Sequence, residues 1–452
     1  MARSSHGWLT PGAIGMLVFA ATSGAAEPDK DIAAALERIS PANIQANIAA
    51  LVGFGTRSTL SAQDPASIAA GHGVGAAREW IRHRFEKYSQ DCGGCMEVRV
   101  DSYTQPPAER VDKPTVISNV YAVLKGTEEG ATPRVVLVTG HYDSRNSDNF
   151  DITHDAPGAN DDASGVAVSL ECARVLSKLK FRATIIFLAV AGEEQGLYGS
   201  AAFARSARAR NMNIEAVLND DIVGGNRSAD QDTHTVRVFS EGLPGRVDEA
   251  GLRAIRITGG ELDSPSRELA RYVAETSRQY GGAVKPMLVF RADRFLRGGD
   301  HSSFNEQGYA AVRFTEYRED FTRQHQTIRT EDGVQYGDVL EHIDADYIAG
   351  VARVNAATLA TLAAAPAPPS NVRILAAKLE NDSTLEWAAA TGASAYEVLW
   401  RATSSPEWEH AQTVSSGTRV TLPVSKDNVV FAVRSLDAQG HRSLPVVPEP
   451  AR

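Results

Sequence analysis

Apolar runs and amphipathic stretches alternate along residues 75–364. Continuous apolar runs that end in polar residues predict strands at 118–126, 134–144, 183–194, 216–224 and 310–316. Apolar residues at helical spacing predict helices at 75–88, 163–179, 266–281 and 346–364. Strands that alternate with helices form a sheet covered on both faces, so we expect a three-layer α/β/α domain with a mixed, mostly parallel sheet.

The pattern changes after the Pro/Ala-rich segment 365–370. Short runs of alternating apolar and polar residues follow, with turn residues between them, which predicts an all-β sandwich over 371–448. Trp387, Tyr396 and Trp400 lie in these runs, whose pattern resembles a fibronectin type III module. We therefore expect an α/β domain at 27–364, a linker at 365–370 and a C-terminal sandwich that carries no catalytic cluster.

Residues 1–26 predict a secretory signal peptide. Arg3 precedes an apolar run from Ala13 to Ala21, and small residues lead to cleavage sites after Ala25 or Ala26. The run is too short to span a bilayer comfortably. We therefore expect an exported protein, periplasmic or extracellular, with no membrane span after cleavage.

The cysteines indicate the redox compartment of the protein, and its net charge excludes one class of partner. Cys92 and Cys95 form a CGGC segment without the second pair of a zinc ribbon, so an oxidising compartment favours a local disulfide. Cys172 lies in an apolar helical stretch and is expected to be a buried free thiol. The chain has 46 basic and 56 acidic residues, a net charge of -10, so nucleic acid is not expected as a partner.

Polar residues gather where the predicted strands stop. The motifs GHYDS, PGANDDASG, AGEEQG and NDDIVG supply four pairs: His141 and Asp143, Asp161 and Asp162, Glu193 and Glu194, Asp220 and Asp221. Each pair alone is compatible with a solvated turn or a helix N-cap. Because ligands bind at the carboxyl ends of the strands in α/β sheets, their recurrence there predicts one shared site.

This combination of residue types favours a metal centre. Several carboxylates in one cleft repel each other unless cations neutralise them. A set of His and carboxylate ligands without thiolates suits zinc, and manganese or cobalt would also fit. Two metal ions about 3.5–4 Å apart and bridged by a carboxylate form a hydrolytic arrangement. Asp161, on a tight turn between the other motifs, is suited to bridging.

The four motifs resemble, in order and spacing, those of metallopeptidase family 28, the secreted co-catalytic zinc aminopeptidases and their relatives. The resemblance covers nearly all of the α/β domain. It implies two zinc ions per chain, held by His141 and Asp221 on one side, by Glu194 on the other, and by Asp161 between them. Asp221 is preferred over Asp220 because it directly precedes the IVG of the family motif.

The same resemblance implies two catalytic roles. Glu193 is the general base for the attacking water, and Asp143 orients the His141 imidazole through its second nitrogen. The expected activity is that of an aminopeptidase, which hydrolyses N-terminal residues from peptides or proteins.

The family also places a ligand histidine late in the domain, and two candidates exist. His325 in TRQHQTIRTEDG lies in the segment where the family has its ligand, although Gln326 replaces the usual Thr. His301 in GGDHSSF resembles a segment that lies near the site and usually does not supply the ligand. We expect His325, with His301 as the alternative.

Other functions stay open. A carboxypeptidase or dipeptidase of the same family would present basic residues to a terminal carboxylate, and Arg291, Arg294 and Arg297 precede His301. A glutaminyl cyclase-like acyltransferase shares the fold and needs one zinc ion. A non-enzymatic binding module is the third alternative, and the complete ligand set together with Glu193 argues against it.

Overall fold

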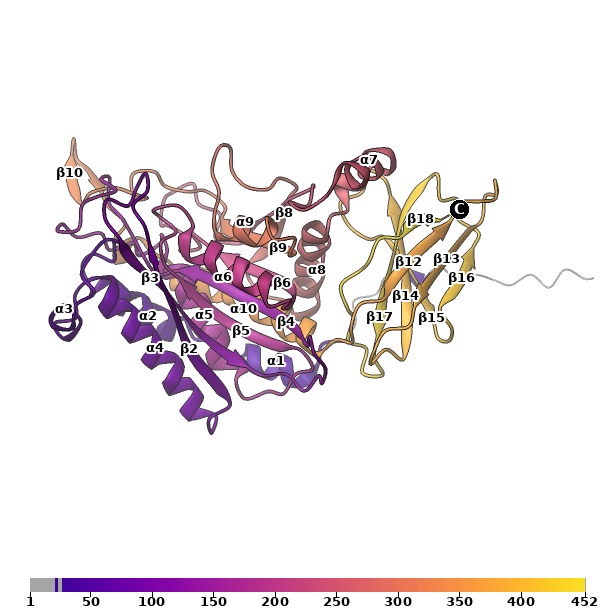
Figure 1. The fold of residues 1–452 in the computed structure, drawn as a ribbon, viewed down its shortest axis with the longest axis horizontal. Helices are drawn as coiled ribbons and strands as arrows, with labels where there is room; N and C mark the ends of the chain where they lie inside the picture. The colour runs from indigo at the N-terminus through magenta and orange to yellow at the C-terminus, as the bar shows by residue number, and fades with distance from the viewer. Residues whose placement is uncertain (1–20, 23–26, 452) are drawn as a thin grey trace, which may run out of the picture.

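The structure is a computed structural model that describes residues 21–22 and 27–451 of the chain (Figure 1). The predicted signal peptide therefore lies outside the described residues, except for the short strand β1 (Ala21–Thr22). The described elements form a large α/β domain followed by a smaller domain of β-strands.

An eight-stranded mixed sheet forms the centre of the α/β domain, with the order β2-β3-β5-β4-β6-β9-β7-β8. The four central strands, β5, β4, β6 and β9, are parallel to one another, and β3 and β7 pair antiparallel with their outer members. The bounds are β2 (Met96–Gln105), β3 (Thr115–Leu124), β4 (Arg134–His141), β5 (Thr184–Val190), β6 (Asn213–Asp220), β7 (Thr235–Ser240), β8 (Lys285–Val289) and β9 (Ala311–Glu316).

Helices cover both faces of this sheet, which confirms the three-layer prediction. One face carries α6 (Tyr198–Ala209) and α9 (Asp300–Asn305), whose Phe203 and Phe304 pack on the sheet. The other face carries the larger core, formed with α1 (Lys30–Leu36), α2 (Pro41–Val52), α4 (Gly73–Asp91), α5 (Ala163–Leu176), α8 (Pro265–Tyr280) and α10 (Ala345–Ala364). Shorter elements are α3 (Pro65–Ala69), α7 (Glu249–Thr258), β10 (Arg329–Glu331) and β11 (Val334–Tyr336).

Helix α10 is long and apolar enough to cross a membrane by length and composition alone. Its most apolar window is 83% buried within the protein, where it packs against α5, α8 and α2. It is therefore a core helix of the α/β domain, and it is the one such helix among the described residues.

The topology brings three strand ends to one edge of the sheet. In the parallel ladders of β4, His141 pairs with Val190 of β5, and Thr139 pairs with Asn219 of β6. The loops that follow β4, β5 and β6 therefore leave the sheet side by side. Helix α5 also begins at this edge, so the four motifs of the sequence converge there.

The C-terminal strands, together with β1, form two four-stranded sheets, β1-β15-β14-β17 and β16-β13-β12-β18. Trp387, Tyr396, Trp400 and Phe431 fill the core between them. The β-rich prediction is therefore confirmed, while kinship with fibronectin type III modules stays a prediction. The bounds are β12 (Ser370–Leu375), β13 (Ser383–Ala388), β14 (Ala395–Ala402), β15 (His410–Val414), β16 (Arg419–Leu422), β17 (Val429–Leu436) and β18 (Glu449–Ala451).

Charged side chains dock this sandwich on the start and one face of α8. Both terminal nitrogens of Arg434 pair with Glu275, at 2.7 and 3.0 Å, and Arg401 pairs with Asp263. The Trp408 indole donates to Glu268 at 3.0 Å. Residues 365 and 366 of the predicted linker are buried, so the segment between the two domains is packed and is not an extended spacer.

The cysteines behave as predicted. Cys92 and Cys95 form a disulfide in the turn between α4 and β2. Cys172 is a fully buried free thiol on α5.

Candidate metal centre

The four sequence motifs place their side chains through local backbone structure. His141 is the last residue of β4, and Glu193 and Glu194 follow β5 by three and four residues. Asp162 is the N-cap of α5, where it accepts a hydrogen bond from the Gly165 amide at 2.8 Å. It also accepts from the His141 amide at 3.0 Å, so its carboxylate belongs to the scaffold of the site.

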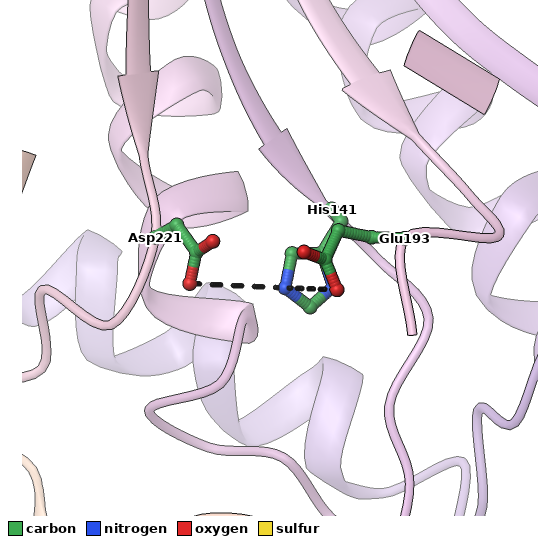
Figure 2. A group of neighbouring side chains, drawn as sticks. All are labelled: His141, Glu193 and Asp221. Carbon is green, nitrogen blue, oxygen red and sulfur yellow. Dashed lines mark ion pairs between the residues drawn. The ribbon is translucent and has the colours of Figure 1, made fainter. Parts of the chain in front are cut away.

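Six side chains form two groups, each able to hold a metal ion. One group consists of His141, Glu193 and Asp221, and the other of Asp161, Glu194 and His325. In the first group, the His141 Nε2 atom lies 3.9 Å from a carboxylate oxygen of Glu193 and 3.9 Å from one of Asp221 (Figure 2). In the second, the His325 Nε2 atom lies 3.0 Å from a Glu194 oxygen.

Asp161 lies between the two groups. Its Oδ1 atom is 3.1 Å from His141 Nε2, and its Oδ2 atom is 2.9 Å from His325 Nε2. The Asp161 amide donates to Asp338 at 2.7 Å, and the Gln324 side chain donates to Asp161 Oδ2 at 3.1 Å. This carboxylate is therefore fixed in a position from which each oxygen faces a different histidine.

The orientation of His141 differs in one detail from the prediction. Its Nδ1 atom is 3.1 Å from the backbone carbonyl of Asp143 and 3.6 Å from the Asp143 carboxylate. A carbonyl can only accept, so Nδ1 carries the hydrogen and the Nε2 lone pair faces the cleft. The Asp143 carboxylate instead accepts hydrogen bonds from the Thr59 hydroxyl at 2.6 Å and from the amides of Glu193 and Glu194, at 3.4 and 3.3 Å.

Arg145 contacts the second group, and sequence reasoning missed it. Its guanidinium lies 3.0 Å from Glu194 Oε2 and 2.6 Å from His325 Nδ1, and it also donates to Asn149 at 2.7 Å. Arginine can only donate, so His325 Nδ1 accepts in this arrangement. Binding of a metal through Nε2 requires a proton on Nδ1, and this contact must then change. Arg145 belongs to none of the four motifs. The only signal for it in the sequence is its position four residues after His141.

Besides Asp143, three polar candidates lie outside both groups. Asp220 turns to the opposite side of β6 and accepts from Asn355 of α10 at 2.8 Å. His301 is buried on α9, with Nε2 at 2.9 Å from the Ala292 carbonyl, and burial lowers its pKa to about 4. Asp162 caps α5, as described above. Among the described residues, His325 and not His301 joins a metal-competent group.

The residues present fit a pair of divalent cations. His141 Nε2 and Glu194 Oε1 are buried and make no hydrogen bond within the described chain, and His141 Nε2 faces the oxygens of Asp161, Glu193 and Asp221. Burial, Asp221 and Glu194 raise the pKa of Glu193 well above its usual value, despite the opposing effect of His141. Burial lowers the pKa of His325, but Glu194 and Asp161 more than offset it and raise the value to about 10. In both groups the neighbouring carboxylates raise these pKa values.

A cavity of about 320 Å³ opens onto both groups. Five of the six grouped residues line it, and only His141 lies behind them. The same lining contains four arginines: Arg110, Arg145, Arg294 and Arg297. The volume suits a small ligand or the end of a peptide, since pockets for small molecules span roughly 300–1,000 Å³.

Comparisons with known proteins agree with this geometry. The sequence profile of peptidase family M28 matches residues 119–359, a span that contains all six grouped residues. A protein of Leptosphaeria maculans described as a probable zinc metalloprotease is 46% identical over 428 residues, which cover 94% of this chain and 98% of that protein. A protein of Pyricularia oryzae with the same description is 47% identical over 434 residues, covering 94% of this chain and 85% of that protein.

Solved structures show the same fold at low sequence identity. The LapA aminopeptidase of Legionella pneumophila superimposes with a TM-score of 0.51 at 20% identity, over 74% of this chain and 75% of that one. The aminopeptidase of Aneurinibacillus sp. strain AM-1 superimposes with a TM-score of 0.51 at 17% identity, over 74% and 96%. Since the family profile covers more than half of the chain and relatives align along nearly all of it, the chain belongs to peptidase family M28 and is a zinc metallopeptidase.

Proposed function

We propose that this metallopeptidase is a two-zinc exopeptidase that removes N-terminal residues from peptides or proteins. The observation that carries the proposal is the position of Asp161 between the two groups, 3.1 Å from His141 and 2.9 Å from His325. A carboxylate shared in this way suits a pair of closely spaced ions. The cavity of about 320 Å³ supports action on the end of a chain.

When bound, zinc would supply the Lewis acidity that a peptide carbonyl and an attacking water need. His141 and Asp221 would hold one ion and Glu194 and His325 the other, with Asp161 between them. The Asp143 backbone carbonyl keeps the His141 lone pair directed at the site. Arg313, fully buried, pairs with Asp221 at 2.8 Å and fixes the orientation of that carboxylate.

Glu193 is assigned as the general base because it differs from its neighbour in exposure and in partners. Its side chain is 14% exposed and lines the cavity, whereas the Glu194 side chain is 3% exposed and paired with Arg145. The Glu193 carboxylate can therefore take a proton from the attacking water and deliver it to the nitrogen of the leaving amine. Glu194 remains fixed throughout.

Two further observations bear on which end of the peptide is hydrolysed. The structural neighbours LapA and the Aneurinibacillus enzyme are described as aminopeptidases, which supports release of N-terminal residues. The arginines in the cavity lining favour a second candidate, a carboxypeptidase or dipeptidase, because guanidinium groups bind terminal carboxylates.

Export to the periplasm or the medium belongs to the same proposal, and the Cys92–Cys95 disulfide supports it.

The test compares two adjacent carboxylates. Glu193→Gln is expected to lower kcat on aminoacyl-arylamides by about 10²–10⁴-fold, the usual contribution of a general base, while zinc stays near two per chain. Glu194→Gln, the matched control, is expected to lose zinc as well as activity. Metal is counted by mass spectrometry, and a chelator should abolish wild-type turnover.

Other outcomes would overturn parts of the proposal. Full activity in Glu193→Gln would remove it as the base. Turnover of N-blocked peptides with a free carboxyl end, but not of aminoacyl-arylamides, would establish the carboxypeptidase. One zinc ion per chain, with cyclisation of N-terminal glutamine, would establish an acyltransferase.

A further inference from the structure

The charge balance of the cleft points to the chemistry of its substrate. The acidic residues in the cavity lining are Asp161, Glu193, Glu194 and Asp221, which are the four carboxylates of the two metal-competent groups. Two divalent cations would balance their charge. No other carboxylate lines the cavity within the described chain, so the positive charge of any lining arginine that is not paired elsewhere in the protein is left over.

The arginines differ in how far other protein groups occupy them. Arg145 has all three nitrogens engaged, by Glu194, Asn149 and His325. Arg294 is paired with Asp293 at 3.0 Å and with Glu319 at 2.5 Å. These two guanidinium groups are therefore occupied by hydrogen bonds and ion pairs within the protein.

Arg110 and Arg297 are the two with unused donors. Arg110 makes one hydrogen bond, to the Glu194 carbonyl at 3.2 Å, and no carboxylate among the described residues pairs with it. Arg297 donates at 3.3 Å to Gln324, and its nearest carboxylate is Glu319 at 3.7 Å. Its side chain is 32% exposed, and its Nε and Nη2 atoms make no hydrogen bond within the described chain.

The carboxylate near Arg297 does not cancel its charge. Glu319 is shared among three arginines, at 2.9 Å from Arg237, 2.5 Å from Arg294 and 3.7 Å from Arg297. Arg297 is the most distant of the three. A guanidinium held in a cleft with spare donors is suited to a planar, two-oxygen anion.

We propose that Arg110 and Arg297 form a carboxylate-recognition site, so that the preferred substrates carry a carboxylate next to the scissile bond. This proposal rests on the proposed peptidase function and names its substrate class. The carboxylate has two sources, an acidic side chain of the terminal residue or the free carboxyl end of a short peptide. Both present the same group to the same guanidinium donors.

The test uses substrate pairs that differ only in this group. The first pair is glutamyl-arylamide and glutaminyl-arylamide, and the second is an N-blocked dipeptide and its C-terminal amide. The zinc-loaded wild type is expected to prefer the carboxylate member of one pair by about tenfold or more in kcat/KM, the scale of a hydrogen-bonded charge pair. The pair that shows this preference identifies the source of the carboxylate.

Variants then assign the preference to the two residues. Arg110→Gln and Arg297→Gln are each expected to lower kcat/KM for the carboxylate member about tenfold more than for its neutral partner. Arg291→Gln, the matched control on the same loop as Arg297, should keep the wild-type ratio, since Arg291 stacks on Phe295 and does not line the cavity. Equal turnover within both pairs, or equal losses for both members in the variants, would overturn the proposal.

A binding measurement separates this proposal from the peptidase function itself. Calorimetry on Glu193→Gln protein compares a glutamate-ended peptide with its glutamine counterpart, and repeats both with Arg297→Gln added. Tighter binding of the glutamate peptide that is lost with Arg297→Gln supports the site even if no peptide is hydrolysed. Equal binding within this pair, and also between an N-blocked dipeptide and its C-terminal amide, would overturn it while leaving the peptidase proposal intact.

Discussion

Replacing Arg434 tests whether buried charge holds the two domains together. The Arg434 side chain is 2% exposed, and its guanidinium bonds Glu397 of the sandwich at 2.7 Å and Glu275 of α8 at 2.7 and 3.0 Å. Removing one partner of a buried pair costs about 3–5 kcal/mol, because the remaining charges lose their compensation. Arg442 still pairs with Glu397 at 3.0 Å, and the Glu275 side chain is 30% exposed, so we expect the lower limit.

A loss of about 3 kcal/mol corresponds to roughly a 150-fold change in the docking equilibrium. For a sandwich of about 80 residues, it lowers the melting temperature of that transition by roughly 10 °C or more. Differential scanning calorimetry of Arg434→Met measures the shift, and limited proteolysis near residues 365–370 reports exposure of the junction. Arg419→Met is the control, because its pair with Glu386 at 3.0 Å faces solvent and should change stability by less than about 1 kcal/mol. An Arg434→Met protein that melts like the control would refute a docking role for this pair.

Two further predictions concern acid and the disulfide. Burial raises the pKa of Glu397, but Arg434 and Arg442 outweigh this effect and hold the pKa below its usual value. A carboxylate with a lowered pKa stabilises the fold at any pH above its unfolded pKa of about 4.3. This stabilisation is lost as the pH falls through the pKa of the folded state. We therefore expect the sandwich transition to weaken below about pH 4, and a calorimetric melting temperature constant down to pH 3 would contradict it. Replacing Cys92 and Cys95 with Ser should cost at most about 2 kcal/mol in urea unfolding, because the closed loop is short. A loss twice that size would mean that the bridge does more than close the turn between α4 and β2.

The central strands could be predicted from the sequence because both of their faces are buried. Every residue of β4 and of β5 is buried, and such strands appear as unbroken apolar runs. The edge strand β2 is mostly exposed and the edge strand β8 has no buried residue, so they carry no comparable pattern and the sequence did not predict them. Strand pairing from the tertiary fold, and not local hydrophobicity, places them in the sheet.

Five of the six metal-competent residues could also be predicted, since each lies in a short motif at a strand or helix end. His325 lies in a loop turn and was one of two candidate histidines. Arg110, Arg145 and Arg313 could not be predicted, because none of them lies in one of these motifs, and loops and strand β9 bring them to the site. That Asp143 lies beside the second nitrogen of His141 could be predicted, but not that its backbone carbonyl, at 3.1 Å, lies closer to Nδ1 than its carboxylate, at 3.6 Å. Sequence identifies which side chains are present at a strand end, but it does not show which atom of each faces its neighbour.

The charged contact between α8 and the sandwich has a consequence for recombining these domains. Glu268 and Asp263 are buried beside arginines, one of which, Arg401, belongs to the sandwich. A graft of the peptidase domain onto another β-domain would leave these carboxylates facing a surface without matching guanidinium groups. A cut at residues 365–370, which the sequence marks as the junction, would separate the two surfaces that these ion pairs join. The transferable unit of this protein is therefore the pair of domains.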